Sequence, residues 1–161
     1  MTPAVGKFDR YPLMRQTSRW EWKVEEVFSF HDPVVGVITC PAPSATDLAS
    51  IRFLREVFRW GAIIAMVFGM FTAAFGLPVV LAIVPALIAL AAVLLYAYIA
   101  GYGNRMGAMH DFLYRTKRFP KEVCDQILWR MARTGEGMAR PRAAVFYLGP
   151  VLGGRRRYGH R

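Results

Sequence analysis

The feature that most constrains this chain is a stretch of forty residues, from Gly61 to Ala100, without a single charged side chain. The stretch also contains no Asn, Gln or His. As one helix it would be about 60 Å long, roughly twice the ~30 Å hydrocarbon core of a bilayer. Gly76-Leu77-Pro78 divides it, because glycine and proline interrupt helices. The sequence therefore predicts two apolar helices that form a membrane-inserting hairpin.

Aromatic residues mark the ends of this hairpin. The first arm, residues 61–75, is short, and Trp60 helps to extend it toward the ~17 residues that a span needs. Three tyrosines lie near the end of the second arm, residues 79–100: Tyr96, Tyr98 and Tyr102. Tryptophan and tyrosine favour the membrane–water interface, so they indicate where each arm leaves the lipid.

Basic residues flank the apolar stretch on both sides. The chain is 55% hydrophobic yet carries a formal net charge of +10, so the two properties are separated along its length. The flanking cations are Arg52, Arg55 and Arg59 before the hairpin, and Arg105, Arg115, Lys117 and Arg118 after it. Because Lys and Arg are retained on the cytoplasmic side, both termini are expected there, with the turn in or across the far leaflet. The lipid bilayer is thus the first expected partner.

Two further features favour a cytoplasmic setting. The first twenty residues contain four basic side chains and no apolar run, which is unlike a secretory signal peptide. Cys40 and Cys124 are the two cysteines, and we expect both to be buried thiols.

The predicted fold class is α+β, a small domain interrupted by the two-helix transmembrane hairpin. Its regions are a β-rich N-terminal part (residues 1–58), the hairpin (59–103), a helical part (104–152) and a basic tail (153–161). Period-two alternation predicts strands around the apolar residues Trp20, Trp22, Val24, Phe28 and Phe30. A second strand is expected over residues 34–39. The His31-Asp32 pair before it precedes Pro33, so we interpret it as part of a turn and not as a functional site.

Helix signals fill most of the remaining chain. Thr46-Asp47 offers a cap for a helix that runs through Arg59 into the first arm. Later helices are expected at residues 105–116, from Pro120 to near Gly135, and at 141–148, before Gly149-Pro150. The tail beyond residue 153 is expected to be solvated, and its Arg155, Arg156 and Arg157 to contact anionic lipid headgroups. DNA is the alternative partner for these arginines.

Two short motifs and an aspartate carry a resemblance to a known family. They are Thr46-Asp47-Leu48-Ala49-Ser50, His110-Asp111-Phe112-Leu113-Tyr114 and Asp125. In this order they resemble a domain-of-unknown-function family of tailed bacteriophages and prophages, over residues 10–58 and 104–153. The chain departs from that family at Ser44-Ala45, at Ile51-Arg52, and in the long segment between the motifs, where the hairpin looks like an insertion. The resemblance implies a phage origin, with other phage proteins as partners.

The residues themselves suggest either a chemical or a structural role for His110. At helical spacing His110 and Tyr114 are neighbours on the packed side, and Asp125 can reach them from the next helix. An imidazole held by a carboxylate is the arrangement of a general base. Asp111, with oxygens such as that of Asp47, is suited to a hard cation. The structural alternative is a buried histidine that bridges two helices through Asp125.

The second motif also resembles, more distantly, calcium-dependent phospholipases of secretory and parvoviral type. That likeness implies His110 as the base, Asp111 as a calcium ligand and Asp125 as the orienting acid, with Tyr114 four residues after the histidine. The Gly-rich calcium loop and the supporting cysteines of those enzymes have no counterpart here.

These observations leave two functional hypotheses. The first is a phage-derived, virion- or tail-associated protein or late accessory factor that engages the host inner membrane, alone or as an oligomer. The second is a calcium-dependent lipid hydrolase that uses His110, Asp111 and Asp125.

Overall fold

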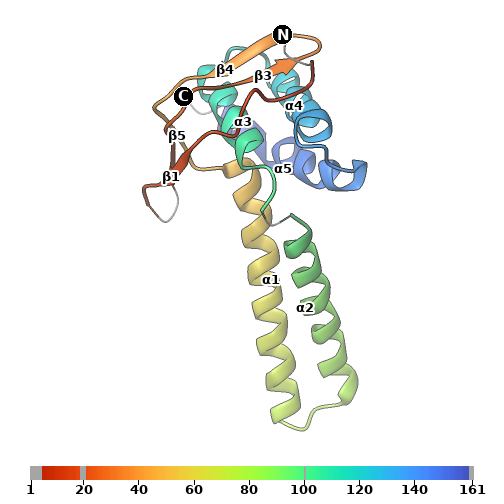
Figure 1. Ribbon diagram of the computed structural model, residues 1–161. Helices are drawn as coiled ribbons and strands as arrows, with labels where there is room; N and C mark the ends of the chain where they lie inside the picture. Colours follow the sequence, from red (N-terminus) through yellow and green to blue (C-terminus); the bar gives the residue numbers. More distant parts are fainter. Residues whose placement is uncertain (1–4, 19–20, 100, 160–161) are drawn as a thin grey trace. The chain divides into compact units, whose positions relative to one another are not determined.

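The computed structural model describes residues 5–18, 21–99 and 101–159, without the side chains at 49–55, 152–157 and 159. Trp20, and the side chains of Ser50, Arg155, Arg156 and Arg157, lie outside this description. The chain forms two compact units: Met1–Arg52 together with Tyr102–Arg161, and Phe53–Gly101. Strands lie in the N-terminal part and helices in the C-terminal part (Figure 1), which confirms the α+β class.

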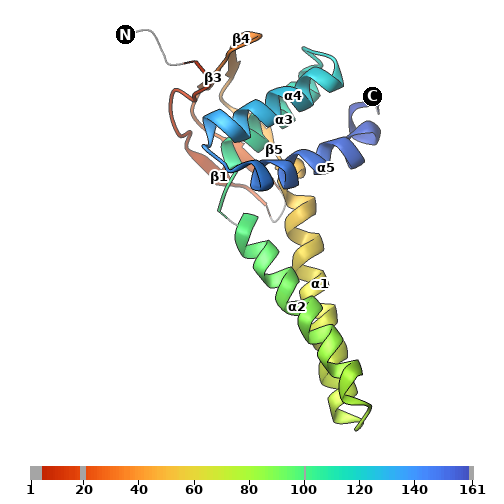
Figure 2. The same ribbon diagram turned by 90° about the vertical axis from the view of Figure 1, so that its right-hand side faces the viewer.

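The second unit is a hairpin of two long helices. Helix α1 spans Ala49–Ala74 and helix α2 spans Val79–Ile99, and they run side by side in both views (Figures 1 and 2). The predicted division at residues 76–78 is confirmed, as is the continuous helix from the N-terminal part into the first arm. Segments Glu56–Ala74 and Val79–Ile99 are long and apolar enough to cross a membrane, by length and composition.

Small residues form the seam between α1 and α2. Ala62 and Ala65 on α1, and Ala89 and Ala92 on α2, are buried. A Cβ added to Gly69 would lie 3.7 Å from the backbone oxygen of Ala82 and 3.7 Å from Pro85 Cβ. Small side chains let the two backbones approach closely, which is typical of helix pairs in lipid.

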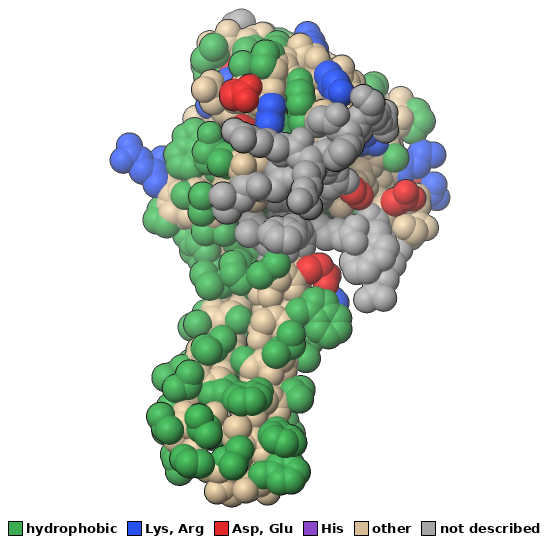
Figure 3. Space-filling model, turned by 180° about the vertical axis from the view of Figure 1, so that it is seen from behind, with side chains coloured by type: hydrophobic (Ala, Val, Ile, Leu, Met, Phe, Trp, Pro, Cys, Tyr) green, Lys and Arg blue, Asp and Glu red, His purple; other side chains and the backbone are tan. Residues whose placement is uncertain are grey.

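The large apolar side chains of the hairpin point away from this seam. Exposed residues include Ile64, Val67, Phe68, Met70 and Phe71 on α1 and Val84, Leu87, Ile88, Leu90 and Leu94 on α2. Figure 3 shows hydrophobic side chains along the visible face of this unit. A water-soluble helix pair places its large apolar residues inside, so the arrangement here is the inverse of a soluble one.

The first unit contains two small antiparallel sheets. Strands β1 (Met14–Gln16), β2 (Trp22–Val24) and β5 (Ser44–Thr46) form one sheet in the order β1-β2-β5. Strands β3 (Phe28–Asp32) and β4 (Gly36–Cys40) form the other, with Phe30 opposite Ile38. The predicted alternation is confirmed, because Val24, Phe28 and Phe30 are buried.

The N-terminal segment adds a further edge to the β3–β4 hairpin. Phe8 forms a β-bridge with Phe30, and the Gly6 amide donates to the His31 carbonyl at 2.6 Å. The Phe8 and Phe30 rings lie 5.0 Å apart, and the Cα of Gly135 packs against them so closely that an added Cβ would lie 2.7 Å from Phe8. Arg105 covers the other side of Phe8 and pairs with Glu136 at 2.8 Å.

Four helical segments complete the unit: α3 (Asn104–Thr116), α4 (Lys121–Arg130), the π-helical turn η1 (Met131–Gly135) and α5 (Arg140–Gly159). The first two helical predictions are confirmed. The expectation of a helix end at Gly149-Pro150 is wrong, because α5 continues through Pro150 to Gly159. The expected solvation of the tail concerns side chains that lie outside the description. Pro150 is buried, so packing of its ring offsets the hydrogen bond that proline removes.

A buried ion pair ties the β3–β4 hairpin to α4. Arg130 Nε donates to Asp32 Oδ2 at 2.7 Å, and the Asp32 side chain is fully buried. Its other oxygen accepts the Val34 and Val35 amides at 2.8 and 3.0 Å. The predicted turn is confirmed, and the Asp32 carboxylate both shapes it and forms an ion pair with a helix, which was not predicted.

Candidate functional site

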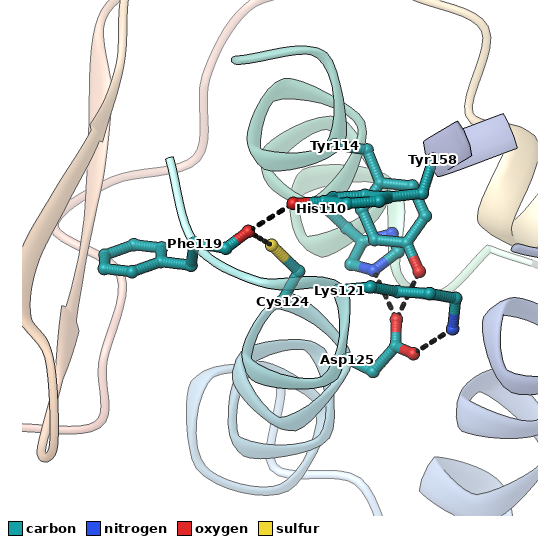
Figure 4. A network of polar contacts seen from close by, with 7 residues as sticks. All are labelled: His110, Tyr114, Phe119, Lys121, Cys124, Asp125 and Tyr158. Carbon is teal, nitrogen blue, oxygen red and sulfur yellow. Dashed lines mark hydrogen bonds and ion pairs between the residues drawn. The ribbon is translucent and has the colours of Figure 1, made fainter. Parts of the chain in front are cut away.

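Helices α3 and α4 bring the three predicted catalytic residues together. His110 and Tyr114 lie one turn apart on α3, and their rings are 4.1 Å apart between centroids. Asp125 projects from α4 toward both (Figure 4). The contact between His110 and Asp125 that the sequence suggested is present, with His110 Nε2 at 3.3 Å from Asp125 Oδ1.

Both oxygens of the Asp125 carboxylate are occupied by side-chain donors. The Tyr114 hydroxyl donates to the same oxygen that His110 contacts. Lys121 Nζ lies 2.6 Å from the other oxygen, Oδ2, as an i,i+4 ion pair on α4. Lys121 was not predicted as part of the site. The signal for it is present in the sequence, because opposite charges four residues apart on a helix commonly form an ion pair.

This network is almost closed to solvent. His110 is 1% exposed and Asp125 is 3% exposed. Burial raises the pKa of the Asp125 carboxyl, but hydrogen bonds from His110, Lys121 and Tyr114 outweigh burial and hold that pKa below its usual value. Burial and the neighbouring Asp125 carboxylate raise the pKa of the Tyr114 hydroxyl, so Tyr114 is a donor here and not a base.

The last turn of α5 covers one side of the network. The Tyr158 ring meets the Tyr114 ring edge-on, with centroids 5.3 Å apart. Its hydroxyl donates to the Phe119 carbonyl at 2.8 Å, the same carbonyl that Cys124 Sγ approaches at 3.4 Å (Figure 4). Burial, followed by the charge of Asp125, raises the pKa of Cys124 to about 11, which makes this thiol unreactive. Cys40 is buried too, and both cysteines are free thiols.

The predicted metal ligand Asp111 has a different partner. Thr46 Oγ1, on β5, donates to Asp111 Oδ2 at 2.6 Å, and the Leu48 amide donates to Thr46 Oγ1 at 3.1 Å. The Thr46 hydroxyl therefore joins β5 to α3. Asp47 is half-buried beside it. Within the residues that the structure describes, no group of three or more His, Cys, Asp or Glu side chains is placed to hold a metal ion.

These contacts define what the arrangement can do. The His110 imidazole is oriented by a carboxylate, as in a catalytic dyad, but its side chain is sealed beneath Tyr114 and α5. A general base must reach the proton that it removes, directly or through one water. The buried network instead links α3, α4 and α5 by charge-assisted hydrogen bonds, and such bonds are stronger than neutral ones.

The lowered pKa of Asp125 predicts a specific loss of stability in acid. The carboxyl has a lower pKa in the folded chain than its reference value of 3.8, so the unfolded chain binds the proton more tightly. The resulting stability is fully present above that reference value and is lost as the pH falls through the folded-state pKa. Asp125→Asn should therefore destabilise the protein at neutral pH by about 1–3 kcal/mol and progressively less in acid.

Unfolding of both proteins in detergent micelles, followed by circular dichroism across this pH range, measures the effect. Glu122→Gln on the exposed face of α4 is the control. A constant difference between wild type and Asp125→Asn at all pH values would contradict the assignment.

The chain matches no protein-family model, and comparison with curated proteins and with solved structures gave no match.

Proposed function

We propose that this protein is a membrane-anchored component of phage origin that engages the host inner membrane through the α1–α2 hairpin. The observation that carries the membrane part of the proposal is the inverted packing of the hairpin. Small residues such as Ala65 and Ala89 are buried in its seam, while Phe68, Met70 and Leu87 face outward. Contact with lipid acyl chains is favourable for such an apolar surface, whereas contact with water is unfavourable.

The phage setting rests on the Thr46–Ser50 and His110–Tyr114 motifs and their resemblance to a phage and prophage family. In that setting the first unit is a virion- or tail-associated module, or a late accessory factor, held at the membrane. Arg155, Arg156 and Arg157 add a cationic cluster that suits anionic headgroups. The Thr46–Asp111 and Asp32–Arg130 contacts hold the strands of the first unit to its helices, and this rigidity supports the scaffold role that we propose for the unit.

The second candidate is a calcium-dependent lipid hydrolase. The 3.3 Å contact between His110 and Asp125 favours it, because an orienting carboxylate is part of such a dyad. Three observations favour the anchored scaffold instead: His110 is sealed from solvent, Lys121 neutralises Asp125, and Asp111 is engaged by Thr46. The scaffold is therefore the better-supported function.

Both ends of the chain are expected on the cytoplasmic side of the membrane. The α1–α2 hairpin returns to the side that it enters, and arginines such as Arg59 and Arg105 flank it on both sides. Fusions of a compartment-sensitive reporter to the N-terminus and to the C-terminus, in separate chains, should give the same cytoplasmic signal. Signals from opposite sides of the membrane would contradict the hairpin topology and indicate a single crossing.

A further inference from the structure

The tip of the α1–α2 hairpin is entirely apolar. Residues 73–81 contain no side chain that forms a hydrogen bond. Phe75, Leu77 and Val79 point outward there, with exposed fractions of 67%, 40% and 70%. A turn that emerged on the far side of a bilayer would place these side chains in water, where apolar surface is unfavourable.

Three backbone amides of the tip donate hydrogen bonds within the hairpin. The Phe75, Gly76 and Leu77 amides all donate back to α1 carbonyls, those of Phe71, Ala73 and Thr72, at 3.1, 3.2 and 3.0 Å. Pro78 has no amide hydrogen, and the Leu81 amide donates to its carbonyl at 2.8 Å. In hydrocarbon an irregular backbone is tolerated only when its polar groups are satisfied within the protein.

One polar side chain lies near the tip, and it is turned inward. Thr72 is the sole hydroxyl residue between positions 61 and 95, and its side chain is fully buried. Its Oγ1 donates to the Gly69 carbonyl at 2.8 Å and lies 3.4 Å from the Leu81 carbonyl, so it also links the end of α1 to the start of α2.

The uncharged part of α1 is short. Arg59 is paired with Glu56 at 3.0 Å and stacks over Trp60 at 5.4 Å, so a polar boundary lies at this point. From Trp60 to Ala74 the helix rises about 22 Å, compared with ~30 Å for the hydrocarbon core. Measured along α1 from this boundary, the tip stops short of the far interface. Helix α2 rises about 31 Å over its 21 residues, so the re-entrant form places the end of α2, with Tyr96 and Tyr98, within the near interface.

From these features we propose that the hairpin is re-entrant: α1 and α2 enter from one side, and the tip at residues 75–79 remains in the hydrocarbon. This inference rests on the proposed membrane anchoring and specifies its form. Lipid acyl chains then cover the outward apolar surface of both helices and of the tip. The tip then lies in the hydrocarbon of the far leaflet, short of its headgroups.

The test is cysteine accessibility in the full-length chain, reconstituted in vesicles of phosphatidylethanolamine and phosphatidylglycerol. Leu77→Cys probes the tip, Val84→Cys the second turn of α2, and Val34→Cys the exposed β3–β4 turn. The unsubstituted chain gives the background, because Cys40 and Cys124 are both buried. A membrane-impermeant maleimide is first added outside the vesicles, and is then brought to both sides of the membrane by freezing and thawing the vesicles.

With reagent on both sides, we expect Val34→Cys to react fully, and Leu77→Cys and Val84→Cys to stay at background until detergent is added. Reaction of Leu77→Cys before detergent, with Val84→Cys still protected, means that the tip reaches water and overturns the re-entrant form alone. Reaction of Val84→Cys before detergent means that the hairpin is not in lipid and overturns the proposed anchoring as well.

Discussion

Replacing Asp125 by alanine is expected to lower the free energy of unfolding by about 3–5 kcal/mol, because it leaves buried donors without an acceptor. The change removes the partner of His110, Tyr114 and Lys121 in one step, and two of these side chains are buried. Chemical denaturation of the detergent-solubilised protein measures the loss. Gln126→Ala, at the next position on the exposed side of α4, should change stability by less than about 0.5 kcal/mol.

The same measurement separates the scaffold from the hydrolase when it is extended to His110→Ala. A structural histidine predicts a loss of about 1–3 kcal/mol, because Asp125 remains buried with one donor fewer. A catalytic base predicts an intact fold and a loss of lipid hydrolysis by about 10²–10⁴-fold. Fatty-acid release by the wild-type protein is therefore assayed with calcium and with a chelator. We expect no calcium-dependent release and a clear loss of stability. Calcium-dependent release that disappears in a stably folded variant would instead establish the enzyme.

The second large effect is expected from a charge on the outer face of the hairpin. Leu87 is 61% exposed near the middle of α2. An arginine at the centre of a membrane helix costs about 2.5–3.5 kcal/mol. At roughly 1.4 kcal/mol per factor of ten, Leu87→Arg should lower the ratio of membrane-inserted to free chains by about two orders of magnitude, and the inserted fraction with it.

Alkaline carbonate extraction of membranes that contain each variant, followed by quantification of pellet and supernatant, measures this fraction. Leu87→Ala is the matched control, because it shortens the side chain without adding charge, and it should remain in the pellet. Equal retention of the arginine and alanine variants would show that this face does not contact lipid.

The sequence predicts those parts of the fold that depend on local composition. An uncharged run that ends at Gly76-Leu77-Pro78 predicts the hairpin, because charge and helix interruption are read over neighbouring residues. Alternation through Val24, Phe28 and Phe30 predicts the strands for the same reason. Pro150 misleads, because proline interrupts helices locally, whereas burial of its ring within the fold permits α5 to continue.

The candidate site is predicted only in part. His110, Tyr114 and Asp125 belong to a motif and its neighbouring helix, so helical spacing places them together. The partner of Asp32 lies 98 residues away and that of Asp111 lies 65 residues away. Such pairs leave no periodic trace in a single sequence, and they emerge only when the two halves of the unit fold together. For this reason the roles of Asp32 and Thr46 were not predicted, and the role of His110 stays a prediction.

The division of the first unit into two chain segments bears on the order in which the protein is made. During synthesis the strands and the whole hairpin leave the ribosome before α3, α4 and α5 exist. The contacts of Thr46 with Asp111 and of Asp32 with Arg130 can therefore form only after the whole hairpin has been made. An antiparallel hairpin that forms first brings its own two ends close together (Figure 1). It thereby removes most of the entropy of closing the loop between the two segments. Under the membrane anchoring that we propose, the hairpin inserts before the first unit can fold, and newly made chains that miss the membrane should be slow to acquire protease resistance.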